Sequence, residues 1–374
     1  MQPEQLDRSK EKLEAFTTRL SPVKVIDQYH LLLEDLFEIR NPRVKFLKEY
    51  KNEIDEFISS YANGKDLAEV GEWFYFPWNQ YLVHYLPAEE HLEIRTARNR
   101  NIITSEEQQK LYGLRVAYAG LSVGSHGALT FALMGGAKKI KIADPDVVSP
   151  SNLNRIRFDF LAVGRKKTDL IKEYVWQLNP YAEISVFDEG VTDATLDEFL
   201  KDVDVLVEET DNLELKIRLR LEARSRGIPV VMATDNGDNI IIEIERFDQD
   251  KNKQLFNGAL GDITLEEFRA FPPPELPKLA TRIAGPNLVT ERMMSSLLEV
   301  GKNIYSWPQL GDAATLSGVA IAYTLKRLAL GEPIKEEKSE INLDATLDPA
   351  YSDSDRVQQR EAARQSFFKT IGFN

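Results

Sequence analysis

A glycine-rich turn is the first place in the sequence where residue types and spacing suggest chemistry. Residues 120–125 read Gly-Leu-Ser-Val-Gly-Ser, between a short apolar segment and a longer apolar stretch. A turn of this kind between a strand and a helix directs backbone N–H groups toward a phosphate. Gly120, Ser122, Gly124 and Ser125 are therefore candidate phosphate-binding residues. A tight turn that binds nothing explains them about as well, because Ser122 and Ser125 stand where the G-x-G-x-x-G pattern has glycine.

Two acids follow the next apolar segment. Asp144 comes some two dozen residues after Gly120, where nucleotide-binding α/β folds place the carboxylate that accepts hydrogen bonds from ribose hydroxyls. Asp146 lies two residues further along. An acid that only caps a loop is the alternative, and the combination with the glycine turn favours ribose binding.

The loop that follows, Ser149-Pro150-Ser151-Asn152-Leu153-Asn154-Arg155, is less generic. Asn152 and Asn154 supply amide donors, and Arg155 supplies a fork-shaped cation, which together suit a triphosphate. Lys167 can add a point charge at the start of the next helix, with Lys166 as its competitor. A solvated surface is the alternative for each of these charges.

A further acid, Asp211, follows the fourth expected strand in the sequence Thr210-Asp211-Asn212. Ligands bind at the carboxyl ends of strands in parallel sheets, so Asp211 is expected near the same edge as the glycine turn. Mg²⁺ prefers one or two carboxylates together with substrate phosphates, which makes Asp211 the candidate metal ligand.

Alternating strands and helices must position these groups. The pattern predicts an α/β fold, a Rossmann-like doubly wound and mostly parallel sheet with an N-terminal helical extension. One strand, at 240–246, is expected to run antiparallel to the other strands of this sheet. Strands are expected at 115–119, 139–143, 183–187, 203–208 and 229–233, and helices at 125–134, 165–178 and 213–226.

The chain divides into four expected regions. Residues 1–94 are helical up to about residue 70 and then aromatic at 71–86, where the rings are expected in a core or subunit interface. Residues 95–247 form the nucleotide-binding domain. Residues 248–333 are loop-rich to residue 285, with a break at Pro272-Pro273-Pro274. Two helices follow, at about 287–303 and 311–330, and pack on the sheet. Residues 334–374 are polar and are expected to be extended or disordered.

Composition narrows the function. A net charge of −13 over 374 residues argues against nucleic acid as a partner. No apolar run is long enough to cross a bilayer, so we expect a cytoplasmic protein with no membrane partner. The sequence has no cysteine, which excludes disulfides, thiolate metal sites and a cysteine nucleophile. Its four histidines have no metal-ligand spacing.

The order of these motifs resembles the ThiF/MoeB/HesA family, which includes the ubiquitin-activating enzymes. The resemblance covers roughly residues 95–245, and Ser-Asn-Leu-Asn-Arg after Asp-Pro-Asp is its most specific part. It implies a homodimer, or a pseudo-dimer with a related chain, in which an arginine reaches into the partner's site; Arg100 matches that position, with Arg98 as the fallback. It assigns Asp144 to the ribose, Asp146 to support of the Mg–nucleotide, Asn152, Asn154, Arg155 and Lys167 to the phosphates, and Asp211 to Mg²⁺ and the reacting phosphate.

The expected activity is that of an adenylyltransferase of this family, using ATP and Mg²⁺. A carboxylate of a small acid, a peptide or a small-protein C-terminus attacks the α-phosphorus of ATP, and pyrophosphate leaves. Arg100, Arg155, Lys167 and Asp211 are the expected catalytic residues. The absence of cysteine matches cysteine-independent, microcin-type members, so the acyl group must pass to another molecule.

Two other functions fit part of the sequence. A non-catalytic nucleotide-binding scaffold or partner subunit is supported by the altered glycine turn. An oxidoreductase that binds NAD(P) or FAD is supported by Gly120 and Asp144 alone. The paired asparagines, Arg155 and Lys167 argue against the oxidoreductase, because a dinucleotide does not account for them.

Overall fold

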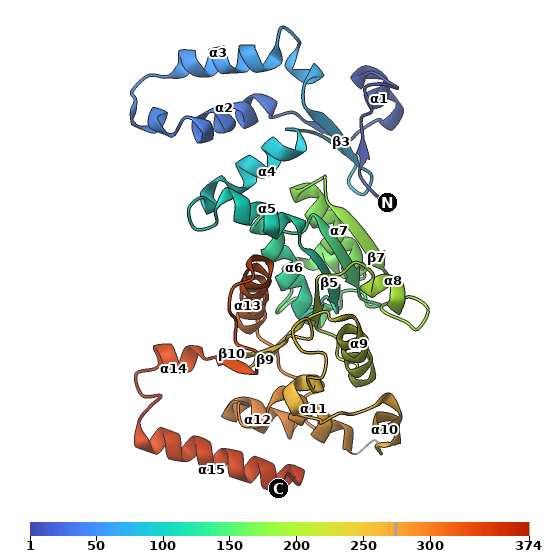
Figure 1. Cartoon of the computed structure of the whole chain (residues 1–374), viewed down its shortest axis with the longest axis vertical. Helices are drawn as coiled ribbons and strands as arrows, with labels where there is room; N and C mark the ends of the chain where they lie inside the picture. The colour runs from blue at the N-terminus through green and yellow to red at the C-terminus, as the bar shows by residue number, and fades with distance from the viewer. Residues whose placement is uncertain (273–274, 374) are drawn as a thin grey trace. The chain divides into compact units, whose positions relative to one another are not determined.

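The computed structural model describes residues 1–272 and 275–373 (Figure 1). Pro273 and Pro274 of the expected proline break lie outside the described residues. The chain forms two compact units. The first unit comprises Met1–Gln109, Leu133–Gly135 and Glu173–Ala182, and the second comprises Lys110–Ala132, Gly136–Lys172 and Glu183–Asn374. No helix in the described part of the chain combines the length and the apolar character that a membrane span needs.

The first unit is built on a four-stranded sheet in the order β1-β3-β4-β2. Its strands are β1 (Glu4–Gln5), β2 (Lys24–Ile26), β3 (Glu72–Phe76) and β4 (Tyr81–Tyr85), and its helices include α1 (Leu13–Leu20), α2 (Tyr29–Arg40), α3 (Lys51–Ala62) and α4 (Ala88–Thr96). The expectation of helices alone before residue 70 is therefore incomplete. Strands of two or three residues, such as β1 and β2, are too short to show a period in the sequence.

The aromatic segment forms the hairpin of β3 and β4 and lies largely in the core of the first unit. Trp73, Phe74 and Phe76 are all buried. The buried His84 ring stacks between Trp73 and Tyr29, with ring centroids 4.2 and 4.0 Å apart. The sequence predicts these aromatic side chains in a core or in a subunit interface, and the structure places most of them in the core of the first unit.

The second unit contains a seven-stranded sheet in the order β11-β10-β9-β8-β5-β6-β7. The ladders that join β5, β6, β7, β8 and β9 are parallel, while β10 and β11 are antiparallel to their neighbours. The predicted mostly parallel α/β fold and the antiparallel strand are confirmed. The strands are β5 (Arg115–Ala119), β6 (Lys139–Ala143), β7 (Glu183–Phe187), β8 (Val205–Glu208), β9 (Val230–Asn236), β10 (Asn239–Glu245) and β11 (Ser339–Ile341).

The strand order reverses at β5, because the chain continues from β5 to β6 on one side and returns to β8 on the other. Such a switch point leaves an opening at the carboxyl ends of the strands. The helices that connect the parallel strands are α6 (Val123–Leu133), α7 (Lys167–Leu178), α8 (Leu196–Leu200) and α9 (Leu213–Arg226).

Helix α13 (Gly311–Leu330) packs against β9 and β10, as the sequence predicts for 311–330. It also lies beside α6 (Figure 1), where two glycines permit a close approach. A Cβ added to Gly127 would lie 2.8 Å from Ile321, and one added to Gly318 would lie 2.4 Å from His126. Small residues on both helices therefore fix their separation.

The structure corrects three expectations for the C-terminal part. The region 248–285 contains α10 (Leu265–Ala270) and α11 (Leu276–Ala284), and the helix expected at 287–303 is the shorter α12 (Glu291–Leu297). The tail is not extended or disordered, because it contains β11, α14 (Leu343–Leu347) and α15 (Ser354–Ile371). Strand β11 is held by backbone pairing to β10, and in α15 only Phe367 is buried, so neither has a strong apolar pattern.

A buried group of charges ties α9 to the sheet. Arg220, Glu208 and Glu245 have no exposed side-chain surface. The Arg220 Nε donates to Glu245 Oε2 at 2.6 Å, its Nη1 donates to Glu208, and its guanidinium lies 4.0 Å from the centroid of the Phe256 ring. Lys216 adds a second cation, with its Nζ 3.2 Å from Glu208. Each buried charge therefore has an opposite partner, which offsets the cost of removing it from water.

Replacing Arg220 by alanine tests how much the fold depends on these charges. Arg220→Ala leaves Glu208 and Glu245 buried without their main partner, so we expect the free energy of unfolding to fall by about 3–5 kcal/mol. Arg226→Ala on the same helix is the control, since it removes only partly exposed pairs with Asp197 and Glu222 and should cost about 0–1 kcal/mol. Urea denaturation of both variants measures the difference, and equal losses would contradict this description.

Candidate functional site

The turn between β5 and α6 lies at the switch point of the sheet. Gly120 has a φ of +88°, and its N–H donates to the Ala143 carbonyl at the end of β6 at 2.9 Å. A Cβ on Gly120 would lie 2.5 Å from the carbonyl carbon of Glu209, which follows β8. No side chain fits there, so only glycine lets the turn approach both neighbouring strands.

Asp144 is held directly against this turn. It is 4% exposed, and its Oδ2 accepts from the Leu121 N–H at 2.6 Å while Oδ1 accepts from the Asp146 N–H at 2.8 Å. Burial raises the pKa of Asp144, and the Lys167 charge and the two backbone donors oppose that rise. Asp144 therefore joins the end of β6 to the turn predicted to bind phosphate.

The two candidate lysines are in different places. The Lys167 Nζ lies 2.9 Å from Asp146 Oδ2 and 3.6 Å from Asp144 Oδ1, and Lys167 is buried. Lys166 instead bonds to Glu189 Oε1 at 3.1 Å. The structure brings Lys167, and not Lys166, to the acids at the end of β6.

Arg155 lies on the other side of the turn. Its Nε donates to Ser122 Oγ at 3.3 Å, and its Nη1 donates to the Ser151 carbonyl and to Asn154 Oδ1, both at 3.0 Å. The Asn154 Nδ2 donates to the Gln309 carbonyl at 2.6 Å. These bonds fix the guanidinium of Arg155 beside the turn.

Two of the candidate polar residues mainly hold their own backbone segments. The Asn152 Oδ1 accepts from the Ser149 N–H at 3.0 Å and so closes the short turn in which it lies. Ser125 is almost fully buried, and its Oγ donates to the Ser122 carbonyl at 2.7 Å, within the start of α6. Gly124 lies beside Glu209, the residue after β8, since a Cβ at Gly124 would lie 3.4 Å from the Glu209 Cγ. The phosphate contacts predicted for these residues stay predictions.

Asp211 is exposed in the loop between β8 and α9. The preceding residue, Thr210, packs against the turn, with its N atom 2.8 Å from the position of a Cβ on Gly120. Asn212 caps α9 by accepting from the Leu215 N–H at 3.0 Å. Within the described part of the chain, the Asp211 carboxylate makes no hydrogen bond or ion pair, so its oxygens are available to a ligand.

Arg100 lies in the first unit. Its Nη2 donates to Glu93 Oε1 at 2.9 Å and its Nη1 donates to the Ile39 carbonyl at 3.2 Å. Arg98, its fallback, is exposed in the same segment. The role of either arginine in a partner's site stays a prediction.

Two further acids lie at this edge of the sheet and were not predicted from the sequence. Glu209 Oε1 accepts from the Ala233 N–H at 2.6 Å, and burial raises the pKa of Glu209 well above its usual range. Asp235 accepts from Ser317 Oγ at 3.0 Å and from Gln309 Nε2 at 3.3 Å. Glu209 directly follows the strand predicted at 203–208, and Asp235 comes two residues after the one predicted at 229–233, within β9. An acid at or just after a strand end is the signal that selects Asp144 and Asp211.

Asp235 gives the protein a testable dependence on pH. Burial raises its pKa from 3.8 to about 6, so the unfolded chain loses this proton at a lower pH than the folded protein does. The contribution to stability is complete below pH 3.8 and is lost as the pH rises to about 6.

Asp235→Asn removes this titration. We expect its free energy of unfolding, relative to the unmodified chain, to increase by on the order of 2–3 kcal/mol between about pH 4 and pH 7. The substitution also removes the acceptor of the Gln309 hydrogen bond, which changes the free energy of unfolding by an amount that does not vary with pH. Urea denaturation at a series of pH values measures the change, and a constant difference would contradict the burial of a titrating Asp235.

Comparison with known proteins gives a family. The model of the ThiF family matches residues 96–237, which include β5 to β9 and every candidate residue named from the sequence. An uncharacterized protein of Mycobacterium tuberculosis is 33% identical over 282 residues, which are 75% of this chain and 39% of that protein.

Two shorter matches have functional names. The tRNA threonylcarbamoyladenosine dehydratase of Bacillus subtilis is 31% identical over 138 residues, and the sulfur carrier protein ThiS adenylyltransferase of Escherichia coli is 28% identical over 137 residues. Each match covers 36% of this chain and 54% of the relative. The chain thus spans about half the length of these two relatives. Residues 96–237 of the chain therefore form a ThiF-family domain.

Proposed function

We propose that this chain is an adenylyltransferase that activates a carboxylate as its acyl-adenylate. Members of the ThiF family bind ATP, and adenylyltransferases occur among them. The observation that carries the proposal is that groups from three chain segments meet at one turn. Asp144, Arg155 and the backbone of Glu209 and Thr210 all contact residues 120–122, at the sheet edge where nucleotides bind.

Asp144 suits a ribose. An ionised carboxylate offers about four lone-pair positions, and the Leu121 and Asp146 N–H groups use two of them. The remaining positions can accept hydrogen bonds from ribose hydroxyls. Asp144 would thus bind the sugar while it holds the turn that faces the phosphates.

Arg155 and Lys167 suit the phosphates. Both are already oriented by protein acceptors, Arg155 by Ser151 and Asn154, and Lys167 by Asp146. A cation fixed before the ligand arrives stabilises developing negative charge without reorganising. The carboxylate of the substrate is itself the nucleophile, so it attacks the α-phosphorus without a general base. The α-phosphorus–oxygen bond to pyrophosphate breaks as the new bond forms.

Asp211 suits Mg²⁺. The described residues contain no group of three or more acidic, histidine or cysteine side chains placed to hold a metal, which fits an ion held mainly by phosphate oxygens. Asp211, with its unengaged carboxylate, would supply the protein ligand, and Asp146 would support the site. Bound Mg²⁺ would neutralise charge on the phosphates.

The acyl group must leave the chain for another molecule. With no cysteine, the chain offers no thiol, so an amine, hydroxyl or thiol of a second substrate would accept the acyl group. The activated acid would be a small acid, a peptide or the C-terminus of a small protein. We further propose a cytoplasmic homodimer, with Arg100 contributed to the partner's site, and a nucleotide-binding domain at residues 95–247.

One observation favours a second function, that of a non-catalytic nucleotide-binding scaffold. Glu209 lies beside Gly124 of the turn expected to bind phosphates, while its carboxyl group accepts from the Ala233 N–H. An ionised Glu209 would repel a phosphate, although burial raises its pKa and so favours the neutral form. Binding of ATP without turnover is the behaviour that this alternative requires.

Exchange of labelled pyrophosphate into ATP tests the proposal. A panel of amino acids, peptides and small-protein C-termini should contain an acid that starts exchange. Asp211→Asn should reduce the exchange roughly 100-fold, because the proposed protein ligand of Mg²⁺ is lost. Asp250→Asn, in the loop after β10 at the opposite edge of the sheet, should leave the rate unchanged.

Calorimetric titration with ATP and Mg²⁺ separates the remaining outcomes. Binding without exchange for any acid would favour the scaffold. An absence of ATP binding would contradict both functions.

A further inference from the structure

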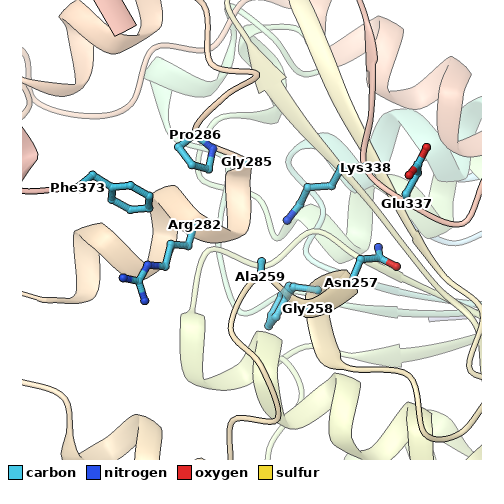
Figure 2. Close-up of a pocket in the computed structure, with 10 residues that line it drawn as sticks. Asn257, Gly258, Ala259, Arg282, Gly285, Pro286, Glu337, Lys338 and Phe373 are labelled. Carbon is cyan, nitrogen blue, oxygen red and sulfur yellow. The ribbon is translucent and has the colours of Figure 1, made fainter. Parts of the chain in front are cut away.

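A cavity of about 550 Å³ lies in the second unit, away from the residues assigned to the nucleotide (Figure 2). Its walls come from the segment after β10, the end of α11, the segment before β11 and the end of the chain after α15. Its volume is within the range of pockets that bind small molecules. None of the residues 120–125, 144–167 or 209–212 lines it.

Two cations line this cavity with donors to spare, and Figure 2 shows the Arg282 guanidinium directed away from the Lys338 ammonium. The Lys338 Nζ lies 3.5 Å from Oε1 of the buried Glu243, a contact that engages one of its three N–H bonds. Within the described part of the chain, the Arg282 guanidinium makes no ion pair and lies 5.3 Å from the centroid of the Phe373 ring. Figure 2 shows the Lys338 ammonium directed into the cavity and the Glu337 carboxylate directed away from it.

The rest of the lining is largely apolar. Phe373, Pro286 and Ala259 supply hydrocarbon surface on several sides (Figure 2). Phe256 and Asn257 form one wall, and their backbone φ values are 53° and 49°. Left-handed conformations of this kind in residues other than glycine cluster at ligand and active sites. The cavity thus combines flat apolar walls with two cations.

We propose that this cavity binds a small carboxylic acid with a flat apolar body. The carboxylate would accept hydrogen bonds from Lys338 and, once the exposed Arg282 side chain rotates toward it, from Arg282. The apolar body would lie against Phe373, Pro286 and Ala259. An anion is favoured because the free donors at the lining belong to cations, while Oε1 of the buried Glu243 is already bonded to Asn257 and Lys338. This site is independent of the proposed adenylation.

Binding of 2-naphthoate to the full chain tests the proposal, with 2-naphthamide as a neutral probe of the same shape. We expect calorimetric titration to detect 2-naphthoate, and Arg282→Gln to weaken it about tenfold through loss of a charged donor. Arg292→Gln, an exposed arginine of α12 outside the lining, is the matched control and should bind like the unmodified chain. Lys338→Gln should also weaken binding, and its thermal unfolding shows whether it remains folded.

Three results would overturn the proposal. These are no binding of 2-naphthoate at its highest soluble concentration, equal affinity for naphthoate and naphthamide, or unchanged affinity in Arg282→Gln. If Lys338→Gln does not fold, Arg282→Gln and the neutral probe still decide the question. Because adenylation is measured by pyrophosphate exchange, failure of either proposal leaves the other intact.

Discussion

Gly120 lies against the backbone of Glu209 and Thr210 so closely that a single added carbon would overlap it. The same turn is hydrogen-bonded to the end of β6 through Ala143 and Asp144. These contacts hold β5 between the carboxyl ends of β6 and β8, at the point where the strand order reverses. The candidate site depends on this close approach, since it sets where Asp144, Arg155 and Thr210 lie relative to one another.

Charge explains how polar groups can gather at this edge of the sheet. Asp144 and Asp146 lie with Lys167, and Asp235 interacts with the charge of Arg155, so each side of the turn carries both signs. The loop that carries Asp211 is held by the last residue of β8. Glu208 accepts hydrogen bonds from the N–H and the hydroxyl of Thr210 and also binds Arg220. The buried ion pairs of α9 thereby position a loop that is itself exposed.

The sequence predicts secondary structure best where apolar segments are clear, and it predicts site residues best where they lie at or after the end of a strand. The parallel strands, α9 and α13 are found at or close to their predicted bounds. Asp144 could be selected because it ends a strand of a parallel sheet, Arg155 because it belongs to the polar loop that follows, and Lys167 because it begins the next helix. The contacts of Asn154 with Gln309 and of Asp235 with Ser317 could not, since they join segments about 80 to 155 residues apart. The short strands β1 and β2 and the charged helix α15 gave no periodic signal.

A crystal structure of the chain with Mg²⁺ and a non-hydrolysable ATP analogue tests the central claim most directly. We expect the ribose at Asp144 and the triphosphate against residues 120–122, within reach of Arg155, Lys167 and Asp211. A nucleotide bound elsewhere, or one whose phosphates point away from the turn, would contradict it.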